Sequence, residues 1–305
     1  MSNIVLEVQN LVKNYGSFRA VDGISFVVPR GKIIGFLGPN GAGKTTTIQM
    51  LLGITLSNGG SIKYFGNDFA SDPLPCLQRI NFTSAFNTLL GRISVWENLI
   101  VFANLYQIQT PEKKIVDLLS YFEIADQRNQ LYKDLSAGQR TRVNLVKSLL
   151  NDPELILMDE PTASLDPDIA DKTLSLIETL RQERNLSILY TSHNMNEITR
   201  ICDEVIFLDH GKIVAQDTPE NLTKRITHTT LRITTSSIND SVKDYLSNEQ
   251  ITYTMREPHI IELTATGESI PRILFGISNT DIHITDIEIN KPTLEDVFLQ
   301  IARKQ

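Results

Sequence analysis

The spacing of hydrophobic residues at the start of the chain predicts strands followed by a loop and a helix. Apolar and polar residues alternate with the period of a β-strand over Ile4–Val8 and again over residues 24–28. The run Ile33–Leu37 is almost entirely apolar and leads into a glycine-rich stretch, which a helical pattern over Thr45–Leu52 follows. Strand, loop and helix in this order predict the first half of a parallel-sheet unit.

The middle of the chain combines a helical region with strongly apolar strands. Residues 77–150 have the spacing of helices, and Thr110–Glu112 predicts a helix start because a hydroxyl residue precedes a proline. Three later runs, Leu155–Met158, Ser187–Tyr190 and Val205–Leu208, are apolar at nearly every position. Such runs are typical of strands buried on both faces, so we expect a mostly parallel core sheet.

Residues beyond about 220 follow a separate pattern. Thr218–Glu220 predicts a helix start, and the segments after it have the order strand, helix, strand, strand, helix, strand, which is that of a split βαβ sandwich. These segments are residues 230–234, 238–246, 251–255, 259–264, 270–277 and 282–289. We therefore predict two domains, residues 1–222 and 223–305, of which the second is small, α+β and ferredoxin-like.

Composition excludes several classes of protein. The 305 residues carry a net charge of -7, whereas a duplex-binding surface usually makes a domain basic, so we expect no nucleic-acid partner. The first ten residues lack the features of a signal peptide, and no apolar run reaches the roughly 18 to 20 residues that cross a bilayer. Cys76 and Cys202 lack the spacing of metal ligands, which favours reduced thiols over a disulfide or a zinc site.

The glycine-rich stretch carries a phosphate-binding motif. Its sequence GPNGAGKT, Gly38–Thr45, matches G-x-x-x-x-G-K-[ST]. Glycines let backbone N–H groups converge on phosphate oxygens, Lys44 supplies a positive charge, and the Thr45 hydroxyl is a ligand for Mg²⁺. A chance glycine-rich turn would lack the strand before it and the helix after it, and both are predicted here. The residues expected to hold the nucleotide in this loop are Gly38, Pro39, Asn40, Gly41, Ala42, Gly43, Lys44, Thr45 and Thr46.

Two carboxylates follow the apolar strand at residues 155–158. Asp159 and Glu160 lie where that strand ends, and ligands of open α/β sheets bind at this edge. We expect Asp159 to hold Mg²⁺ and Glu160 to polarise the attacking water, because phosphoryl transfer needs charge neutralisation and an oriented nucleophile. Without the phosphate loop, the simpler interpretation of Asp159 and Glu160 would be two acidic surface residues at the end of a strand. Beside a phosphate loop the pair indicates ATP hydrolysis.

Further motifs extend this pattern along the chain. The sequence LSAGQ at Leu135–Gln139 precedes a helix, Ser164–Asp166 follows the two carboxylates, and His193 follows the strand at 186–191. With the phosphate loop and the carboxylates, this set resembles the ATP-binding cassette (ABC) ATPases over about residues 4–220. The resemblance implies a P-loop NTPase cassette with an antiparallel β subdomain and a helical subdomain, here at about residues 77–150, beside the small C-terminal domain.

The resemblance also implies contacts within one subunit. Tyr15 would stack on adenine. Without the resemblance, the simpler interpretation is a tyrosine at the end of a strand. Val21 would also contact the nucleotide. Lys44 would act in catalysis, and His193 would bond the γ-phosphate and orient water together with Glu160. A single histidine is more often structural, but this one follows a strand at the ligand edge of the sheet.

A site shared between two subunits is implied as well. Ser136, Gly138 and Gln139 would contact ATP bound to the opposite subunit, with Ser136 capping the γ-phosphate at a helix N-terminus. Asp166 would lie at the dimer seam. The partner would be a second cassette in a head-to-tail homodimer, which two ATP molecules close and hydrolysis reopens.

Two positions depart from the family's pattern. Ala137 replaces the glycine that is commoner in the signature, which adds a methyl group near the phosphate. Members of the family also carry a glutamine about a dozen residues before a helix start like that at Ile93–Leu99, and here Ala85 occupies that slot. Alanine cannot ligate Mg²⁺ or bond water, so we expect altered coupling or slow turnover unless Ser84 or Asn87 substitutes.

The resemblance implies a transport motor. The segment TLEDVFL at residues 293–299 is similar to the closing segment of cassettes in the bacterial drug, polysaccharide and lipid exporter branch, although an amphipathic helix that merely closes the domain gives the same pattern. We expect an ATPase subunit on the cytoplasmic side of the membrane, bound through residues 86–106 to a separate permease that selects the cargo. The alternatives are a soluble ABC ATPase without a transport role and an ATP sensor that scarcely hydrolyses.

Overall fold

The chain divides into two compact units, Met1–Pro219 and Glu220–Gln305. The sequence predicts a boundary after residue 222, whereas the division falls at Pro219, where helix α8 (Pro219–Lys224) begins. Proline suits the first position of a helix, because its missing N–H would have no partner there. The computed structural model describes residues 3–84, 89–163, 165–226, 228–237, 239–256, 259–280 and 282–303.

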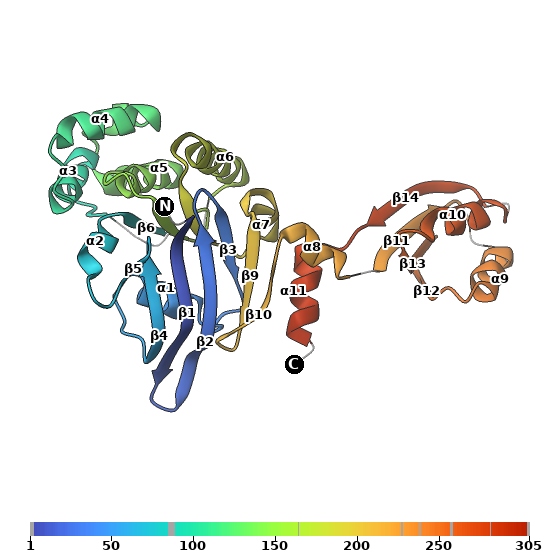
Figure 1. Ribbon diagram of the computed structural model, residues 1–305. Coiled ribbons are helices and arrows are strands. Elements are labelled where there is room, and N and C mark those ends of the chain that lie inside the picture. The colour runs from blue at the N-terminus through green and yellow to red at the C-terminus, as the bar shows by residue number, and fades with distance from the viewer. Residues whose placement is uncertain are drawn as a thin grey trace. The chain divides into compact units, whose positions relative to one another are not determined.

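A six-stranded sheet forms the centre of the first unit (Figure 1). Its strands are β3 (Ile33–Leu37), β6 (Ile80–Ser84), β7 (Leu155–Asp159), β8 (Ser187–Thr191), β9 (Glu204–Asp209) and β10 (Lys212–Asp217). They lie in the order β10-β9-β3-β8-β7-β6, and the neighbours from β9 to β6 are all parallel, whereas β10 is antiparallel to β9. Every residue of β3 and β8 is buried, which confirms the mostly parallel core that the apolar runs predict.

A second, antiparallel sheet shares a core with the first. Its strands are β1 (Ile4–Tyr15), β2 (Phe18–Pro29), β4 (Gly59–Tyr64) and β5 (Asn67–Asp68), in the order β2-β1-β4-β5. One hydrophobic cluster contains Val8 and Phe26 of this sheet, Phe36 of β3 and Ile48 of helix α1 (Lys44–Leu51). The helix that follows the phosphate loop is therefore held by both sheets. This sheet is the antiparallel β subdomain that the family resemblance implies.

Other helices of this unit are α2 (Pro73–Leu77), α3 (Val95–Leu105), α4 (Pro111–Tyr121), α5 (Ala137–Ser148), α6 (Pro167–Arg184) and α7 (Met195–Ile201), with 3-10 turns at Ala125–Gln127 and Tyr132–Asp134. Helices α3, α4 and α5 contact one another at one end of the unit and form the helical subdomain (Figure 1). Helix α4 begins with Pro111, as the sequence predicts, and α3 begins at a capping box between Ser94 and Glu97. The helical region starts later than residue 77, because β6 intervenes at the edge of the central sheet.

A partly buried lysine joins the helical subdomain to the central sheet. Lys147 of α5 donates from Nζ to Asn81 Oδ1 and to the Phe82 carbonyl oxygen, both at 3.0 Å, and lies 5.2 Å from the centre of the Phe102 ring. Burial lowers the pKa of Lys147 to about 8, because the charged ammonium is poorly solvated. These contacts fix β6, whose end leads into residues 85–88, which lie outside the described part of the chain.

The second unit combines a four-stranded antiparallel sheet with two helices packed on one of its faces. Its elements after α8 are β11 (His228–Thr235), α9 (Asp240–Asn248), β12 (Tyr253–Arg256), β13 (Ile260–Thr266), α10 (Ile270–Ser278), β14 (Ile284–Asn290) and α11 (Leu294–Arg303). The strands lie in the order β12-β13-β11-β14, which is that of a split βαβ sandwich. Leu231 and Ile261 of the sheet pack with Val242 of α9 and Ile273 of α10.

The structure also bears on the cysteines and on membrane spans. Cys76 and Cys202 are both free and both buried. Burial raises the pKa of the Cys202 thiol, so it stays uncharged. In the part of the chain that the structure describes, no helix combines the length and the hydropathy that crossing a bilayer demands.

Candidate functional site

Close backbone contacts require glycine in the phosphate loop between β3 and α1. Gly43 has a φ of +104° directly before α1, and a Cβ there would lie 2.5 Å from the Ala20 carbonyl oxygen. A Cβ on Gly38 would lie 2.3 Å from the Leu208 carbonyl oxygen. Because only glycine fits such contacts, the loop can lie tightly between β2 and β9. The positive N-terminus of α1 at the end of this loop favours an anion.

Lys44 lies over the phosphate loop. Its Nζ donates to the carbonyl oxygens of Gly38 and Pro39, at 2.5 and 3.1 Å. Burial lowers the pKa of Lys44, and the carboxylates of Glu160 and Asp159 oppose that shift. The ammonium therefore interacts with the loop and with the two acids, and it can neutralise the charge of phosphate oxygens there.

Thr191 of β8 fixes both acids. Its hydroxyl donates to Asp159 Oδ1 at 2.6 Å and accepts the backbone N–H of Glu160 at 3.1 Å. The Glu160 N–H also lies 3.0 Å from the Thr191 carbonyl oxygen, and Glu160 has a left-handed φ of +51°, which turns the chain at the end of β7. Thr191 belongs to none of the sequence motifs, because its contact with Asp159 depends on the register of two parallel strands. Its nearest signal is its position two residues before His193.

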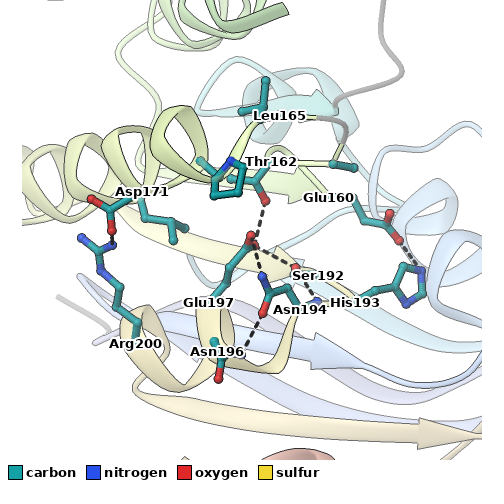
Figure 2. A pocket seen from close by; sticks show the side chains of 14 residues that line it. Glu160, Thr162, Leu165, Asp171, Ser192, His193, Asn194, Asn196, Glu197 and Arg200 are labelled. Carbon is teal, nitrogen blue, oxygen red and sulfur yellow. Dashed lines mark hydrogen bonds and ion pairs between the residues drawn. The ribbon is translucent and has the colours of Figure 1, made fainter.

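The predicted base and the predicted histidine lie in contact (Figure 2). His193 Nε2 is 2.6 Å from Glu160 Oε1. The Glu160 side chain is 20% exposed, whereas the imidazole is 54% exposed, so the pair faces solvent through the histidine. A carboxylate beside an imidazole at this edge of the sheet can hold a water molecule and accept its proton.

Oxygen donors suited to Mg²⁺ lie at the same edge of the sheet. Thr45 is the second residue of α1 and is exposed, Thr46 follows it, and Asp159 ends β7. A hydroxyl and a carboxylate are ligands that Mg²⁺ prefers, and phosphate oxygens and water complete its shell in such sites. The donor set therefore fits Mg²⁺ bound together with a nucleotide.

Tyr15 and Val21 lie in different environments. Tyr15, at the end of β1, is 48% exposed, and Lys13 Nζ lies 5.1 Å from the centre of its ring. An exposed ring of this kind can stack on adenine. Val21 has no exposed surface and packs beneath Gly43, 3.4 Å from where a Cβ would stand. The Val21 side chain therefore supports the loop from beneath, and its contact with the nucleotide stays a prediction.

The signature segment begins α5 through a capping box. Ser136 Oγ accepts the Gln139 N–H at 3.3 Å, and Gln139 Oε1 accepts the Ser136 N–H at 2.8 Å. Because the serine oxygen accepts this bond, its hydroxyl hydrogen remains to be donated. Ala137 is the first residue of α5 and is exposed, so its methyl group faces solvent and does not pack in the core.

The signature lines a cavity together with the first turns of α6. A cavity of about 190 Å³ adjoins the signature, and its lining comes from α5 and α6: Ser136, Gly138, Gln139, Arg142, Ile169, Lys172, Thr173 and Leu176. Neither Lys44 nor Glu160 lines this cavity. Asp166 directly precedes α6, and its side chain does not cap that helix. Ser164 lies outside the described residues.

The position where the family carries glutamine is only partly described. Ala85 and Asn87 lie outside the described residues. Ser84, the last residue of β6, is buried and lies opposite Asp159 in the register of β6 and β7. Of the residues considered for this slot, Ser84 is therefore the one that the structure places beside the carboxylate that fits Mg²⁺.

The chain is similar to known proteins along its whole length. Residues 21–163 match the family described as ABC transporter. The Nod factor export ATP-binding protein I of Ralstonia nicotianae is 33% identical over 318 aligned positions, which cover 100% of this chain and 95% of that protein. The linearmycin resistance ATP-binding protein LnrL of Bacillus subtilis is 29% identical, and the match covers 98% of each chain.

A solved structure matches most of the chain in fold. The ATP-binding subunit of an ABC transporter superposes with a TM-score of 0.66 at 26% identity, over 72% of this chain and 92% of that chain. The match therefore extends over nearly all of a chain whose fold is that of the cassette. Together with the full-length relatives, it shows that this chain belongs to the ABC transporter family as an ATP-binding subunit.

Proposed function

We propose that the chain is a Mg²⁺-dependent ATPase that drives export through a separate permease. The observation that supports this most is the contact of 2.6 Å between Glu160 and His193. The two acids at this edge also interact with Lys44 of the phosphate loop. One surface thus combines a phosphate-binding loop, a carboxylate that fits Mg²⁺ and a group that can act as a base, which is what phosphoryl transfer to water needs.

The residues of this surface have separate tasks in the proposed reaction. The loop amides and Lys44 bind the phosphate oxygens. Thr45 and Asp159 would hold Mg²⁺, which would supply positive charge to the phosphates. Glu160 accepts the proton of the attacking water. His193, held against Glu160, donates a hydrogen bond to the γ-phosphate and keeps the water in line.

The proposal includes a head-to-tail homodimer. Within one chain the signature lines a cavity with α6, and neither Lys44 nor Glu160 lines that cavity. In a dimer, the hydroxyl of Ser136 and the amides at the N-terminus of α5 would bind the γ-phosphate held by the partner's loop. Asp166, whose side chain does not cap α6, would lie at the seam.

The export role rests on the relatives and on exposed apolar residues. The relatives are named for Nod factor export and for linearmycin resistance. In the helical region Leu90, Val101 and Leu105 are exposed, and exposed apolar residues on one subdomain favour a protein contact. We propose that this subdomain docks on the permease and that the chain lies at the cytoplasmic face of the membrane.

Phosphate release from ATP by the purified chain tests the proposed function. We expect hydrolysis that requires Mg²⁺ and stops when EDTA removes the metal, because Lys44 alone then offsets the charge of the phosphates and of Asp159 and Glu160. Excess Mg²⁺ should restore the activity. A chain that binds Mg-ATP and releases no phosphate would instead support the alternative of an ATP sensor.

Gly138→Ala is expected to disturb the signature through its neighbour on α6. A Cβ on Gly138 would lie 2.8 Å from Ile169 Cγ2, so either the branched side chain of Ile169 or one of the two helix starts must shift. We expect phosphate release to fall about tenfold or more, because a displacement of about 1 Å near the reacting groups costs up to about 100-fold.

The double variant Gly138→Ala with Ile169→Ala separates packing from direct contact with the nucleotide. Removing the Ile169 side chain beyond Cβ eliminates the clash, so most of the activity should return. Ile169→Ala alone is the control. A loss that persists in the double variant would show that Gly138 acts on the phosphate directly and not through packing.

A further inference from the structure

A buried carboxylate lies beside the Glu160–His193 pair. Glu197 of α7 is 7% exposed and, together with Glu160 and His193, lines a cavity of about 480 Å³. Its carboxylate lies among the lining side chains, with bonds to several of them (Figure 2). The proposed mechanism assigns no task to this residue.

Three hydroxyl groups donate to one oxygen of this carboxylate. Glu197 Oε2 accepts from Thr162 Oγ1 at 2.7 Å, from Ser192 Oγ at 2.8 Å and from the Tyr190 hydroxyl at 3.0 Å. Asn194 Nδ2 donates to the other oxygen at 3.5 Å. Burial raises the pKa of Tyr190 well above its usual value, and the charge of Glu197 adds to this shift, so the phenol keeps the proton that it donates.

Two of the donors lie in the segments that carry the reacting groups. Thr162 is two residues after Glu160, in the loop between β7 and α6, and Ser192 directly precedes His193. The Ser192 hydroxyl also accepts the backbone N–H of Asn194 at 3.0 Å, which closes the turn around His193. One carboxylate of α7 therefore joins the loop after the base to the turn that carries the histidine.

Stability alone does not account for a carboxylate at this position. Across the described ranges, no cationic side chain forms an ion pair with Glu197. Arg200, further along α7, pairs with Asp171 and Glu178 of α6. A buried carboxylate without a cation loses hydration that neutral hydroxyl groups replace only in part, whereas an apolar side chain of similar size would incur no such cost.

We propose that Glu197 is a positioning residue for ATP hydrolysis, which holds Thr162 and Ser192 and so fixes the loop after Glu160 against the turn of His193. The inference rests on the proposed function, because it concerns the same site. Neither segment can shift alone without breaking a bond to a shared oxygen. The base and the histidine therefore respond together when the γ-phosphate binds or leaves.

The contact between Glu160 and His193 provides a test that needs no hydrolysis. Protein labelled with ¹⁵N-histidine reports the imidazole of His193, which is assigned as the signal that His193→Gln removes. We expect Glu197→Leu, which removes the acceptor and keeps the approximate size, to shift the His193 ring signals. Glu178→Leu is the matched control, because it removes a glutamate beside Arg200 and leaves the three hydroxyl donors untouched. Unchanged His193 signals in Glu197→Leu would refute the proposal, even for a chain that hydrolyses no ATP.

Turnover separates positioning from a general loss of structure. We expect Glu197→Leu to lower kcat about 10- to 100-fold and to leave KM for ATP within about twofold, because the reacting groups move while the phosphate loop does not. Glu197→Gln keeps an oxygen where the three hydroxyls converge and should recover most of kcat. An equal fall in Glu178→Leu, or a rise in KM without a fall in kcat, contradicts the proposal.

If Glu197→Leu does not fold, the double variant Thr162→Val with Ser192→Ala tests the same hydrogen bonds. These changes remove two donors and leave the carboxylate in place. We expect a lower kcat and shifted His193 signals, as in Glu197→Leu, and no further loss when all three changes are combined, because they act through one contact. Full activity and unchanged His193 signals in the double variant would overturn the proposal.

Discussion

Glu160→Gln is expected to abolish ATP hydrolysis and to leave ATP binding intact. The amide keeps the size of the side chain but cannot accept the proton of the attacking water, so kcat should fall by about 100- to 10,000-fold. The left-handed backbone of Glu160 and the bond from its N–H to Thr191 are main-chain features, which glutamine leaves unchanged. Phosphate release measures the loss, and titration calorimetry with ATP measures the retained affinity.

The same variant should accumulate as an ATP-bound dimer. If ATP closes two chains and hydrolysis reopens them, a chain that binds without hydrolysing should elute as a dimer with Mg-ATP and as a monomer without it. Glu178→Gln changes a carboxylate of α6 that pairs with Arg200, and it serves as the control. Hydrolysis near the wild-type rate in Glu160→Gln would mean that another group acts as the base.

Lys44→Ala should weaken ATP binding by roughly 30- to 1,000-fold, because removing a partly buried charge that pairs with phosphate oxygens costs about 2 to 4 kcal/mol. The lysine also bonds the carbonyl oxygens of Gly38 and Pro39, so alanine leaves two acceptors of the loop without their donor. The fluorescence of a trinitrophenyl derivative of ATP measures the affinity. Hydrolysis should fall with it, because less nucleotide is bound.

An exposed lysine of the second unit provides the control for Lys44→Ala. Lys224 pairs with Glu220 on the surface of α8, and Lys224→Ala should change neither binding nor hydrolysis. If Lys44→Ala bound ATP within about twofold of the wild type, the motif would not be a phosphate site in this chain. Glu160→Gln lowers kcat and Lys44→Ala lowers affinity, so one pair of assays distinguishes the two roles.

Features that lie within one continuous segment could be predicted from the sequence. The apolar run Ile33–Leu37, the glycines after it and the helical pattern that follows are neighbours along the chain, and β3 and α1 confirm the predicted elements around the loop. The strand that ends in Asp159 is confirmed for the same reason. Each of these patterns depends on backbone periodicity and on glycine geometry, which are local properties.

Features that depend on how segments meet could not be predicted. Thr191 contacts Asp159 because β7 and β8 pair in a particular register, and Glu197 meets the Thr162 hydroxyl because α7 packs near the loop after β7. The orientation of the Val21 side chain could not be predicted either. Its place beside the phosphate loop follows from the resemblance, but the direction of its side chain depends on the packing of β2 into the shared core.

The tight contacts of the phosphate loop have a consequence for the thermodynamics of nucleotide binding. Gly38 and Gly43 leave no space for a side chain against the carbonyl oxygens of Leu208 and Ala20, so the loop has few other shapes open to it before a ligand arrives. Ordering one flexible residue costs roughly 1 to 2 kcal/mol of conformational entropy, and a loop that is already ordered avoids that cost. In the proposed homodimer, the free energy of phosphate binding would then be available to bring the two chains together.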